Sequence, residues 1–276
     1  MGRITDAFHR MKTEGRTGLV TYLTAGFPHP DLTPALVAAM EEGGADLIEL
    51  GIPFSDPLAD GTTIQRANFA ALRQGVTPWT CLEVVREVRR RGVQAPLLLM
   101  GYYNPVLAYG QEDFCRDAAA AGVDGLIIVD LPPEEGDDLR RAAGAHGLDL
   151  ICLVAPTSTD DRIARLVELA SGFIYCVSVA GVTGARQELP PTLPAFLERV
   201  RSRTHLPLAV GFGIASRRQV EQVGAAADAV VVGSALIDVL ERAPHGQEVQ
   251  QVRQFVAELA GRPAEASRAT GRSAED

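Results

Sequence analysis

The chain has 276 residues, a formal net charge of -9 at pH 7 and 46% hydrophobic residues. Its basic residues are scattered, which argues against a nucleic-acid surface. No stretch reaches the ~18 apolar residues that a membrane span requires, and residues 1–12 lack the apolar core of a signal peptide. We therefore predict a cytoplasmic protein with no nucleic acid and no membrane among its partners.

Lysine, histidine and cysteine usage limits the possible chemistry. Lys12, in the predicted N-terminal helix, is the only lysine, so Schiff-base chemistry has no nucleophile available. The five histidines fall in predicted helices or in turns away from the ends of predicted strands, which disfavours a metal site. The four cysteines have no metal-type spacing and are interpreted as structural. We expect no bound metal.

The hydrophobic pattern predicts the elements in chain order. Ile4, Phe8 and Met11 recur at helical spacing, so an amphipathic helix comes first and is expected to plug one end of the fold. Short, nearly continuously apolar strands follow at residues 19–24, 47–51, 96–101, 125–129, 149–154, 173–177, 208–211 and 229–232. Helices are predicted at about residues 32–42, 62–74, 78–91, 111–121, 133–146, 160–171, 193–203, 216–226, from 234 onward, and at 247–259.

This alternation defines the fold class. Apolar strands separated by helices every ~25 to 35 residues predict an α/β fold with a parallel sheet covered by helices on one side. Eight such units favour a single closed (β/α)8 TIM barrel, which typically needs about 250 residues, over an open doubly wound sheet. No glycine fingerprint for a dinucleotide follows the first strand. We predict a catalytic barrel domain over residues 1–260, including the extra N-terminal helix, and a flexible, disordered tail over residues 261–276.

Two carboxylates mark the stretch 47–61, in which a buried strand runs into an acidic, proline-rich loop. Glu49 lies among apolar strand residues, and strand alternation can turn it inward near the barrel mouth. Desolvation would then raise its pKa and suit it to general acid catalysis. Asp60 ends the following loop and can hang over the same mouth. The alternatives are a buried arginine partner for Glu49, and for Asp60 the N-cap of the helix that starts near Thr62.

The loops after the last two predicted strands indicate an anion site. Gly211, Phe212 and Gly213 follow the seventh strand, while Gly233 and Ser234 follow the eighth and open a helix. Glycines let the backbone approach an anion closely, and a helix start offers free N–H groups. Barrels that act on phosphorylated substrates hold the phosphate at these two loops.

The long loop after the sixth strand is expected to complete this site through Thr183 and Gly184, and to close as a lid. The residues alone thus predict a barrel that binds a phosphorylated substrate and uses carboxyl groups as acid and base. Carbon–carbon cleavage without a lysine or a metal needs a leaving carbon that can accept a proton. The C3 atom of an indole ring can do this, with Asp60 stabilising positive charge that develops at the ring N–H.

Residues 47–61 resemble the signature of the tryptophan synthase α subunit over its whole length. Further segments that resemble this family lie at residues 101–105, 130–132, 178–184 and 211–214. The resemblance implies a lyase that cleaves indole-3-glycerol phosphate to indole and glyceraldehyde 3-phosphate. It also implies that Glu49 shuttles the proton, Asp60 binds the indole N–H and Tyr175 assists near the glycerol part.

The same resemblance implies the remaining contacts to the substrate. Tyr22, Ile64 and Tyr102 would line the indole pocket, with Tyr22 standing where the family often has phenylalanine. The residues that would hold phosphate are Gly184, Gly213, Gly233 and Ser234.

The family also implies a partner, a β subunit that carries pyridoxal phosphate and receives indole in an αββα heterotetramer, so that this chain has no cofactor of its own. Prolines and aromatic residues predicted to be exposed at one face of the barrel suggest a docking surface, with ordinary loop punctuation as the alternative. These residues are Pro53, Phe54, Pro57, Tyr103, Pro105 and Pro132. Two other functions stay open: a sugar-phosphate isomerase or epimerase barrel, and a non-catalytic subunit that activates a partner.

Overall fold

The computed structural model of the chain describes residues 2–177, 191–211 and 213–262. Within these residues, eight parallel strands close into a barrel in which each strand pairs with its neighbours in sequence and β8 pairs with β1. The strands are β1 (Gly18–Thr24), β2 (Leu47–Gly51), β3 (Leu97–Gly101), β4 (Gly125–Ile128), β5 (Asp149–Val154), β6 (Ile174–Val177), β7 (Leu208–Gly211) and β8 (Ala229–Val232). The predicted (β/α)8 barrel is confirmed.

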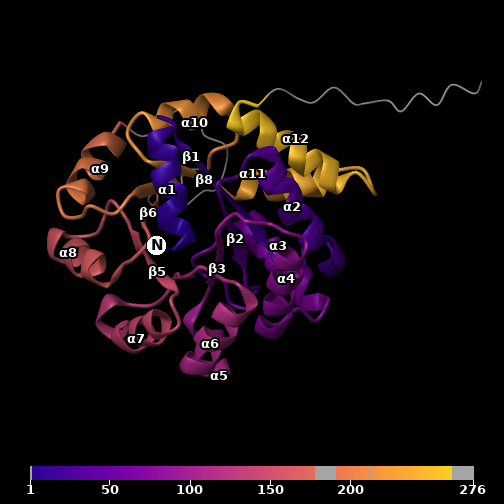
Figure 1. Ribbon diagram of the computed structural model, residues 1–276, viewed down its shortest axis with the longest axis horizontal. Helices are drawn as coiled ribbons and strands as arrows, with labels where there is room; N and C mark the ends of the chain where they lie inside the picture. Colours follow the sequence, from indigo (N-terminus) through magenta and orange to yellow (C-terminus); the bar gives the residue numbers. More distant parts are fainter. Residues whose placement is uncertain (1, 178–190, 212, 263–276) are drawn as a thin grey trace, which may run out of the picture.

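Helices surround the strands, which lie at the centre of the view in Figure 1. The α-helices are α1 (Arg3–Thr13), α2 (Thr33–Gly43), α3 (Thr62–Arg73), α4 (Pro78–Arg90), α5 (Tyr103–Tyr109), α6 (Gln111–Ala121), α7 (Asp137–Ala145), α8 (Asp160–Leu169), α9 (Leu193–Arg201), α10 (Arg217–Gly224), α11 (Ser234–Arg242) and α12 (Glu248–Ala260). Two short 3-10 turns are η1 (Pro30–Leu32) and η2 (Pro133–Glu135). In the described part of the chain, no helix combines the length and the apolar character that crossing a membrane requires.

The helices differ from the prediction in two places. No helix was predicted over the residues of α5, which include Pro105. Pro105 occupies the third position of α5, where a missing N–H removes no intrahelical hydrogen bond. The single helix predicted at 133–146 is instead η2 followed by α7, with Gly136 between them. From residue 263 onward, the predicted tail lies outside the described residues.

Strand alternation separates the barrel interior from the layer under the helices. In β2, Leu47 belongs to the interior cluster, while Ile48 and Leu50 pack in the outer core against the helices. Because successive strand residues point to opposite faces, Glu49 turns inward with Leu47, as predicted. The strand therefore carries a carboxyl group into the barrel.

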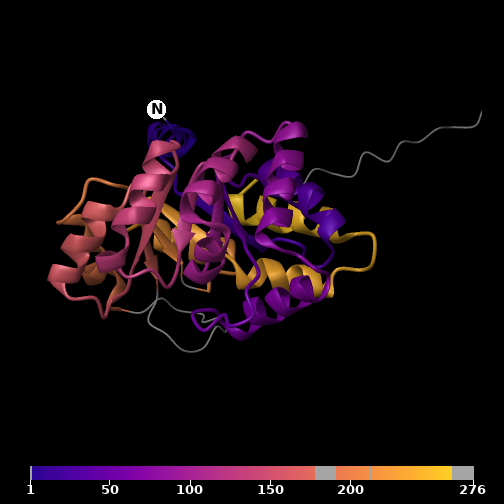
Figure 2. The ribbon, with the colours of Figure 1, turned by 90° about the horizontal axis from the view of Figure 1, so that it is seen from below.

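Helix α1 closes the amino-terminal end of the barrel. Its apolar face packs with interior residues of the strands, and the Phe8 ring lies 5.5 Å from the ring of Phe173, the residue just before β6. A Cβ atom on Gly18, at the start of β1, would lie only 2.2 Å from the sulfur of Met11. Figure 2 shows α1 at one end of the barrel. The predicted plug is confirmed.

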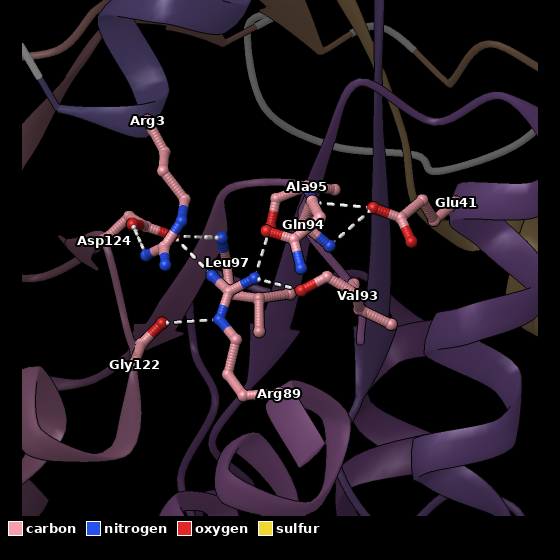
Figure 3. Close-up of polar contacts among 9 residues, drawn as sticks. All are labelled: Arg3, Glu41, Arg89, Val93, Gln94, Ala95, Leu97, Gly122 and Asp124. Carbon is pink, nitrogen blue, oxygen red and sulfur yellow. Dashed lines mark hydrogen bonds and ion pairs between the residues drawn. The ribbon is translucent and has the colours of Figure 1, made fainter. Parts of the chain in front are cut away.

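Ion pairs fix the amino-terminal end of the barrel (Figure 3). Arg89, on α4, donates to the Asp124 carboxylate at 2.6 Å, and also to backbone carbonyls of the adjoining loops. Asp124 also accepts from the Leu97 amide at 2.8 Å and from Arg3 of α1 at 2.9 Å. One carboxylate thus connects α1, α4 and the start of β3, at the end of the barrel opposite the carboxyl ends of the strands.

Candidate active site

Glu49 is a fully buried carboxyl group inside the barrel, with 0% of its surface exposed. In the strand register it lies between Tyr22 of β1 and Leu98 of β3. Among the residues that the structure describes, neither carboxylate oxygen has a hydrogen-bond partner, so the alternative of a buried arginine partner is not supported. Burial raises the pKa of Glu49 to about 8, so the group is mainly protonated at neutral pH.

Asp60 is a half-buried carboxyl group at the end of the loop between β2 and α3. It accepts a hydrogen bond from Asn68 Nδ2 at 3.1 Å and another from the Tyr102 hydroxyl. The Tyr102 hydroxyl itself accepts from the Ala59 amide at 2.9 Å. Burial raises the pKa of Asp60 to about 6, while these two hydrogen bonds oppose the rise. Asp60 is therefore mainly ionised at pH 7.

The N-cap alternative for Asp60 is wrong. Gly61 occupies the N-cap position of α3, and no side chain caps the helix. The Asp60 carboxylate instead contacts Asn68, which lies in the second turn of the helix. The carboxylate keeps acceptor capacity beyond these two bonds, because an ionised carboxyl group offers about four lone-pair sites.

Tyr175 of β6 is the third predicted catalytic residue, and it is buried at 8% exposure. Burial, and then Glu49 and the neighbouring ionisable groups, hold the pKa of Tyr175 well above its ordinary value, so its hydroxyl is neutral and can donate. A Cβ atom on Gly211 would lie 2.9 Å from the Tyr175 ring. Glycine at this position of β7 therefore makes room for the ring, a packing role that the predicted anion site did not include.

A cavity of about 520 Å³ opens beside these groups. Asp60 and Tyr175 both line it, and Glu49, which has no exposed surface, interacts electrostatically with Tyr175. Other lining residues come from the carboxyl ends of β3 to β6 and the segments after them, among them Met100, Val129, Leu131, Val177 and Ser158. The structure thus brings the three predicted catalytic residues together at one end of the barrel.

The predicted pocket residues occupy different positions around the mouth. Tyr22 and Tyr102 are buried at the ends of β1 and β3, and the Tyr102 ring stacks on Phe54 with ring centroids 5.0 Å apart. Ile64 is half-buried on α3 and packs against the outer core. Burial, and then Asp60, keep the pKa of Tyr22 well above its usual range.

The described part of the predicted anion site lies at the ends of β7 and β8. Gly211 ends β7, Gly213 has a φ of +64°, and Gly233 precedes Ser234, the first residue of α11. A Cβ atom on Gly233 would lie 3.5 Å from Cβ of Tyr22, so this turn borders the pocket side of the mouth. The other predicted residues, Thr183, Gly184 and Phe212, lie outside the described residues.

Sequence reasoning missed Asn68. This side chain is 2% exposed on α3 and donates to Asp60. The sequence could have indicated that this asparagine is buried, because it lies on the same face of the predicted helix as Ala67 and Ala71, which are both fully buried. Buried polar groups are almost always hydrogen-bonded, so such an asparagine points to a nearby polar partner.

The predicted docking surface needs a correction. Pro53 and Pro57 are buried rather than exposed, and Phe54 is half-buried. The loop folds back on itself, with the Asp60 amide donating to the Pro57 carbonyl at 3.0 Å. The exposed apolar side chains of this region are Leu58, at 92% exposure, and Leu107, at 47%.

The fold and the site define a class of protein. A (β/α)8 barrel enzyme builds its active site at the carboxyl ends of the strands. Here that end holds a protonated carboxyl group, an ionised carboxylate and a neutral tyrosine around a cavity. Groups of titratable residues whose pKa values are pushed apart are typical of acid–base catalysis. The four cysteines are buried and free, and the described residues contain no cluster of metal-ligating side chains.

Comparisons with known proteins identify the family. The family model described as tryptophan synthase alpha chain matches residues 8–267. The tryptophan synthase alpha chain of Roseiflexus sp. (strain RS-1) is 56% identical over 261 residues, which cover 95% of this chain and 100% of the relative. That of Chloroflexus aurantiacus is 54% identical over 259 residues, covering 94% and 97%.

Solved structures agree with these relatives. The tryptophan synthase subunit alpha of Legionella pneumophila str. Paris superposes with a TM-score of 0.87 at 38% identity, covering 95% of this chain and 98% of that one. A chain of Mycobacterium tuberculosis tryptophan synthase gives a TM-score of 0.87 at 41% identity, covering 94% and 97%. The chain belongs to the tryptophan synthase alpha chain family and is an enzyme of tryptophan synthesis.

Proposed function

We propose that this chain is an indole-3-glycerol-phosphate lyase, which cleaves its substrate to indole and glyceraldehyde 3-phosphate by a retro-aldol reaction. The observation that carries the proposal is Glu49, a carboxyl group that burial keeps protonated near neutral pH and that has no partner among the described residues. A buried acid without a partner is free to exchange its proton with a ligand.

Each of the three candidate catalytic residues has one role in the proposed reaction. Glu49 donates its proton to C3 of the indole ring, and Asp60 accepts a hydrogen bond from the ring N–H and stabilises the positive charge that develops there. The bond between C3 and the glycerol carbon then breaks, and its electron pair restores the ring. The adjacent glycerol hydroxyl becomes an aldehyde and returns a proton to the Glu49 carboxylate. Tyr175 donates to the glycerol part.

The phosphate of the substrate would bind at the loops after β7 and β8. Support comes from the glycine turns at Gly211, Gly213 and Gly233, and from Ser234 at the start of α11. The first turn of a helix has N–H groups without intrahelical partners and favours an anion. The residues proposed to complete the site are Thr183, Gly184 and Phe212. Tyr22, Ile64 and Tyr102 would line the indole pocket.

We further propose that indole passes to a β subunit, in an αββα heterotetramer in the cytoplasm, and that pyridoxal phosphate belongs to that partner. This chain's single lysine, Lys12, lies on α1, which closes the end of the barrel opposite the candidate site. The proposed docking surface consists of Phe54, Leu58, Tyr103, Pro105, Leu107 and Pro132. No observation favours an isomerase, an epimerase or a non-catalytic subunit.

The test is the release of indole from indole-3-glycerol phosphate by the purified chain, with and without a β subunit. We expect slow release by the chain alone and faster release with the partner. Glu49→Gln should lower kcat by about 10²- to 10⁴-fold, the range of general acid–base catalysis, while the Kd for substrate changes by less than about threefold.

The matched control is Glu248→Gln, which changes a glutamate with 7% exposure on α12, a helix that packs against α2, α10 and α11. This variant should keep the activity of the unchanged chain. The absence of indole release in both conditions would contradict the proposed reaction. Full activity of Glu49→Gln would contradict the role of that residue.

A further inference from the structure

Four polar side chains form a continuous hydrogen-bonded chain that ends at Asp60. The Tyr22 hydroxyl lies 3.1 Å from Thr24 Oγ1, and Thr24 Oγ1 lies 3.5 Å from Asn68 Oδ1. Asn68 Nδ2 then donates to Asp60 Oδ2 at 3.1 Å. Tyr22, Thr24 and Asn68 are buried, at 7%, 0% and 2% exposure. Such a network specifies its geometry strongly, because each unsatisfied member would be costly in a low-dielectric interior.

The donors in this chain all point toward the carboxylate. A hydroxyl group has one proton to donate. Thr24 donates its proton to the Asn68 carbonyl oxygen, so the Tyr22 hydroxyl donates to Thr24. The amide group of Asn68 then donates to Asp60. This direction suits an ionised carboxylate, which only accepts hydrogen bonds.

The space for the Tyr22 hydroxyl depends on Gly51. A Cβ atom at position 51 would lie 2.1 Å from that hydroxyl oxygen and 2.7 Å from Cζ of the ring. Gly51 is also the register partner of Thr24 in the pairing of β1 with β2. The glycine therefore lets the hydroxyl reach Thr24, a contact that the lining of an apolar pocket does not require.

We propose that Tyr22 is a positioning residue, whose hydroxyl acts through Thr24 and Asn68 to hold the Asp60 carboxylate in place and in its ionised form. The inference rests on the proposed role of Asp60 and adds to it a group that need not touch the reacting atoms. It differs from a role in which Tyr22 only lines the pocket.

Other groups also act on Asp60. The Tyr102 hydroxyl donates to it directly from the end of β3, and Tyr175 of β6 interacts with it electrostatically. Glu49 of β2 lies in the same interior and is neutral over most of the range below pH 8. These groups remain in a Tyr22→Phe variant, so a change in Asp60 would report the loss of the Tyr22 hydroxyl.

The test is the pH dependence of kcat/KM for indole release by the full chain carrying Tyr22→Phe. The acid limb should report the ionisation of Asp60, whose pKa is about 6. We expect this limb to move up by about 0.5 pH unit, because the ionised form loses hydrogen-bond support. The ratio of the activity at pH 5 to the activity at pH 7 should then fall about 2.5-fold relative to the unchanged chain.

Variants of Thr24 test the path of the coupling. Thr24→Val removes the hydroxyl that links Tyr22 to Asn68, so its acid limb should shift at least as far. Thr24→Ser retains the hydroxyl and should keep the original limb. The double variant Tyr22→Phe/Thr24→Val should shift no further than Thr24→Val alone, since residues in one network are not additive. If Thr24→Val does not fold, Tyr22→Phe and Thr24→Ser still give the comparison.

The matched control is Tyr109→Phe. The Tyr109 hydroxyl also donates to a carboxylate, Asp117 Oδ2, at 2.8 Å, but this pair joins α5 to α6 outside the barrel mouth. This variant should leave the acid limb unchanged. The proposal would be overturned if Tyr22→Phe changed kcat/KM by the same factor at every pH, or not at all. Tyr22 would then only line the pocket.

A second readout does not depend on turnover. The Asp60 carboxyl carbon can be titrated by carbon-13 NMR in the full chain, with Asp60→Asn used to assign its signal. Tyr22→Phe should raise the midpoint by about 0.5 pH unit, and an unchanged midpoint would overturn the proposal. If the chain released no indole, the proposed function would fail while this titration would still decide whether Tyr22 acts on Asp60.

Discussion

At the scale of single residues, the site separates two carboxyl groups by their surroundings. Glu49 is fully buried with no partner among the described residues, and burial raises its pKa to about 8. Asp60 is half-buried and receives donors from Asn68 and Tyr102, which limit the rise of its pKa to about 6. Between these two values the first group is mainly an acid and the second mainly a base. This difference supplies the two protonation states that the proposed reaction needs.

The buried Glu49 should make stability depend on pH. Its pKa is about 8 in the folded chain against an ordinary value of 4.5, so between these pH values the folded state binds more protons than the unfolded state. The free energy of unfolding therefore falls as pH rises, by about 5 kcal/mol in total. Glu49→Gln should remove this loss and stabilise the chain at pH 8 but not at pH 4.5, as measured by urea unfolding.

Glu87, on the protein surface, should contribute a pH dependence of stability opposite to that of Glu49. Arg91 holds the pKa of Glu87 below its usual value, so Glu87 contributes stability above that value and loses it as pH falls. Glu87→Gln should therefore be slightly destabilising at pH 8 and neutral in acid. If Glu49→Gln and the unchanged chain were equally stable at pH 8, a raised pKa for Glu49 in the folded state would be excluded.

At the scale of elements, the structure assigns different tasks to the two ends of the barrel. Helix α1 and the ion pairs of Asp124 close the amino-terminal end. The loops and short helices at the carboxyl ends of the strands carry the candidate site. Helix α5 also lies at this end of the barrel, and the sequence pattern did not suggest it. Pro105 is accommodated because it lies in the first turn of the helix.

The plug formed by α1 should contribute to the stability of the fold without affecting catalysis. Phe8→Ala should lower the free energy of unfolding by about 3 kcal/mol, because it removes a buried ring that packs against Phe173. At a temperature where both proteins are folded, kcat/KM should change by less than about twofold. Calorimetry and the indole assay measure the two effects.

The matched control for this variant is Phe69→Ala, which removes a ring that is 44% exposed on α3. It should cost much less stability, about 1 kcal/mol or below, since nearly half of its surface is already in contact with water. Equal losses from Phe8→Ala and Phe69→Ala would contradict the role of α1 as a packed plug.

At the scale of the whole molecule, the candidate site and the exposed apolar residues share one end of the barrel. Leu58 lies in the loop that ends at Asp60, and Leu107 lies on α5 just after β3. Exposed apolar patches on a protein surface indicate an interaction site. A partner bound there would contact the loop that carries Asp60, which couples partner binding to the candidate site by direct contact.

If Leu58 belongs to the proposed docking surface, Leu58→Asp should weaken binding of a β subunit by about tenfold or more, because it places a charge where an apolar side chain would be buried on association. Isothermal titration calorimetry measures the Kd. The control is Thr5→Asp, which adds the same charge at an exposed position of α1, at the opposite end of the barrel. If both variants bound the β subunit as the unchanged chain does, Leu58 would be excluded from the docking surface.

The sequence by itself determined the barrel, the plug and which residues of β2 share a face with Glu49. Alternating strands and helices, the spacing of Ile4, Phe8 and Met11, and the two-residue period of β2 are local patterns, and local patterns are what a sequence displays directly. The stretch 47–61 likewise carries both carboxylates in one continuous segment.

Only the tertiary structure decided how the second carboxylate is held and which residues of its loop are exposed. Asn68 reaches Asp60 from α3, and Pro57 is covered while Leu58 is not. Gly211 makes room for Tyr175 across a strand pair. These features depend on contacts between segments that are separated in the chain, and the hydrophobic pattern of one segment does not encode the distance to another.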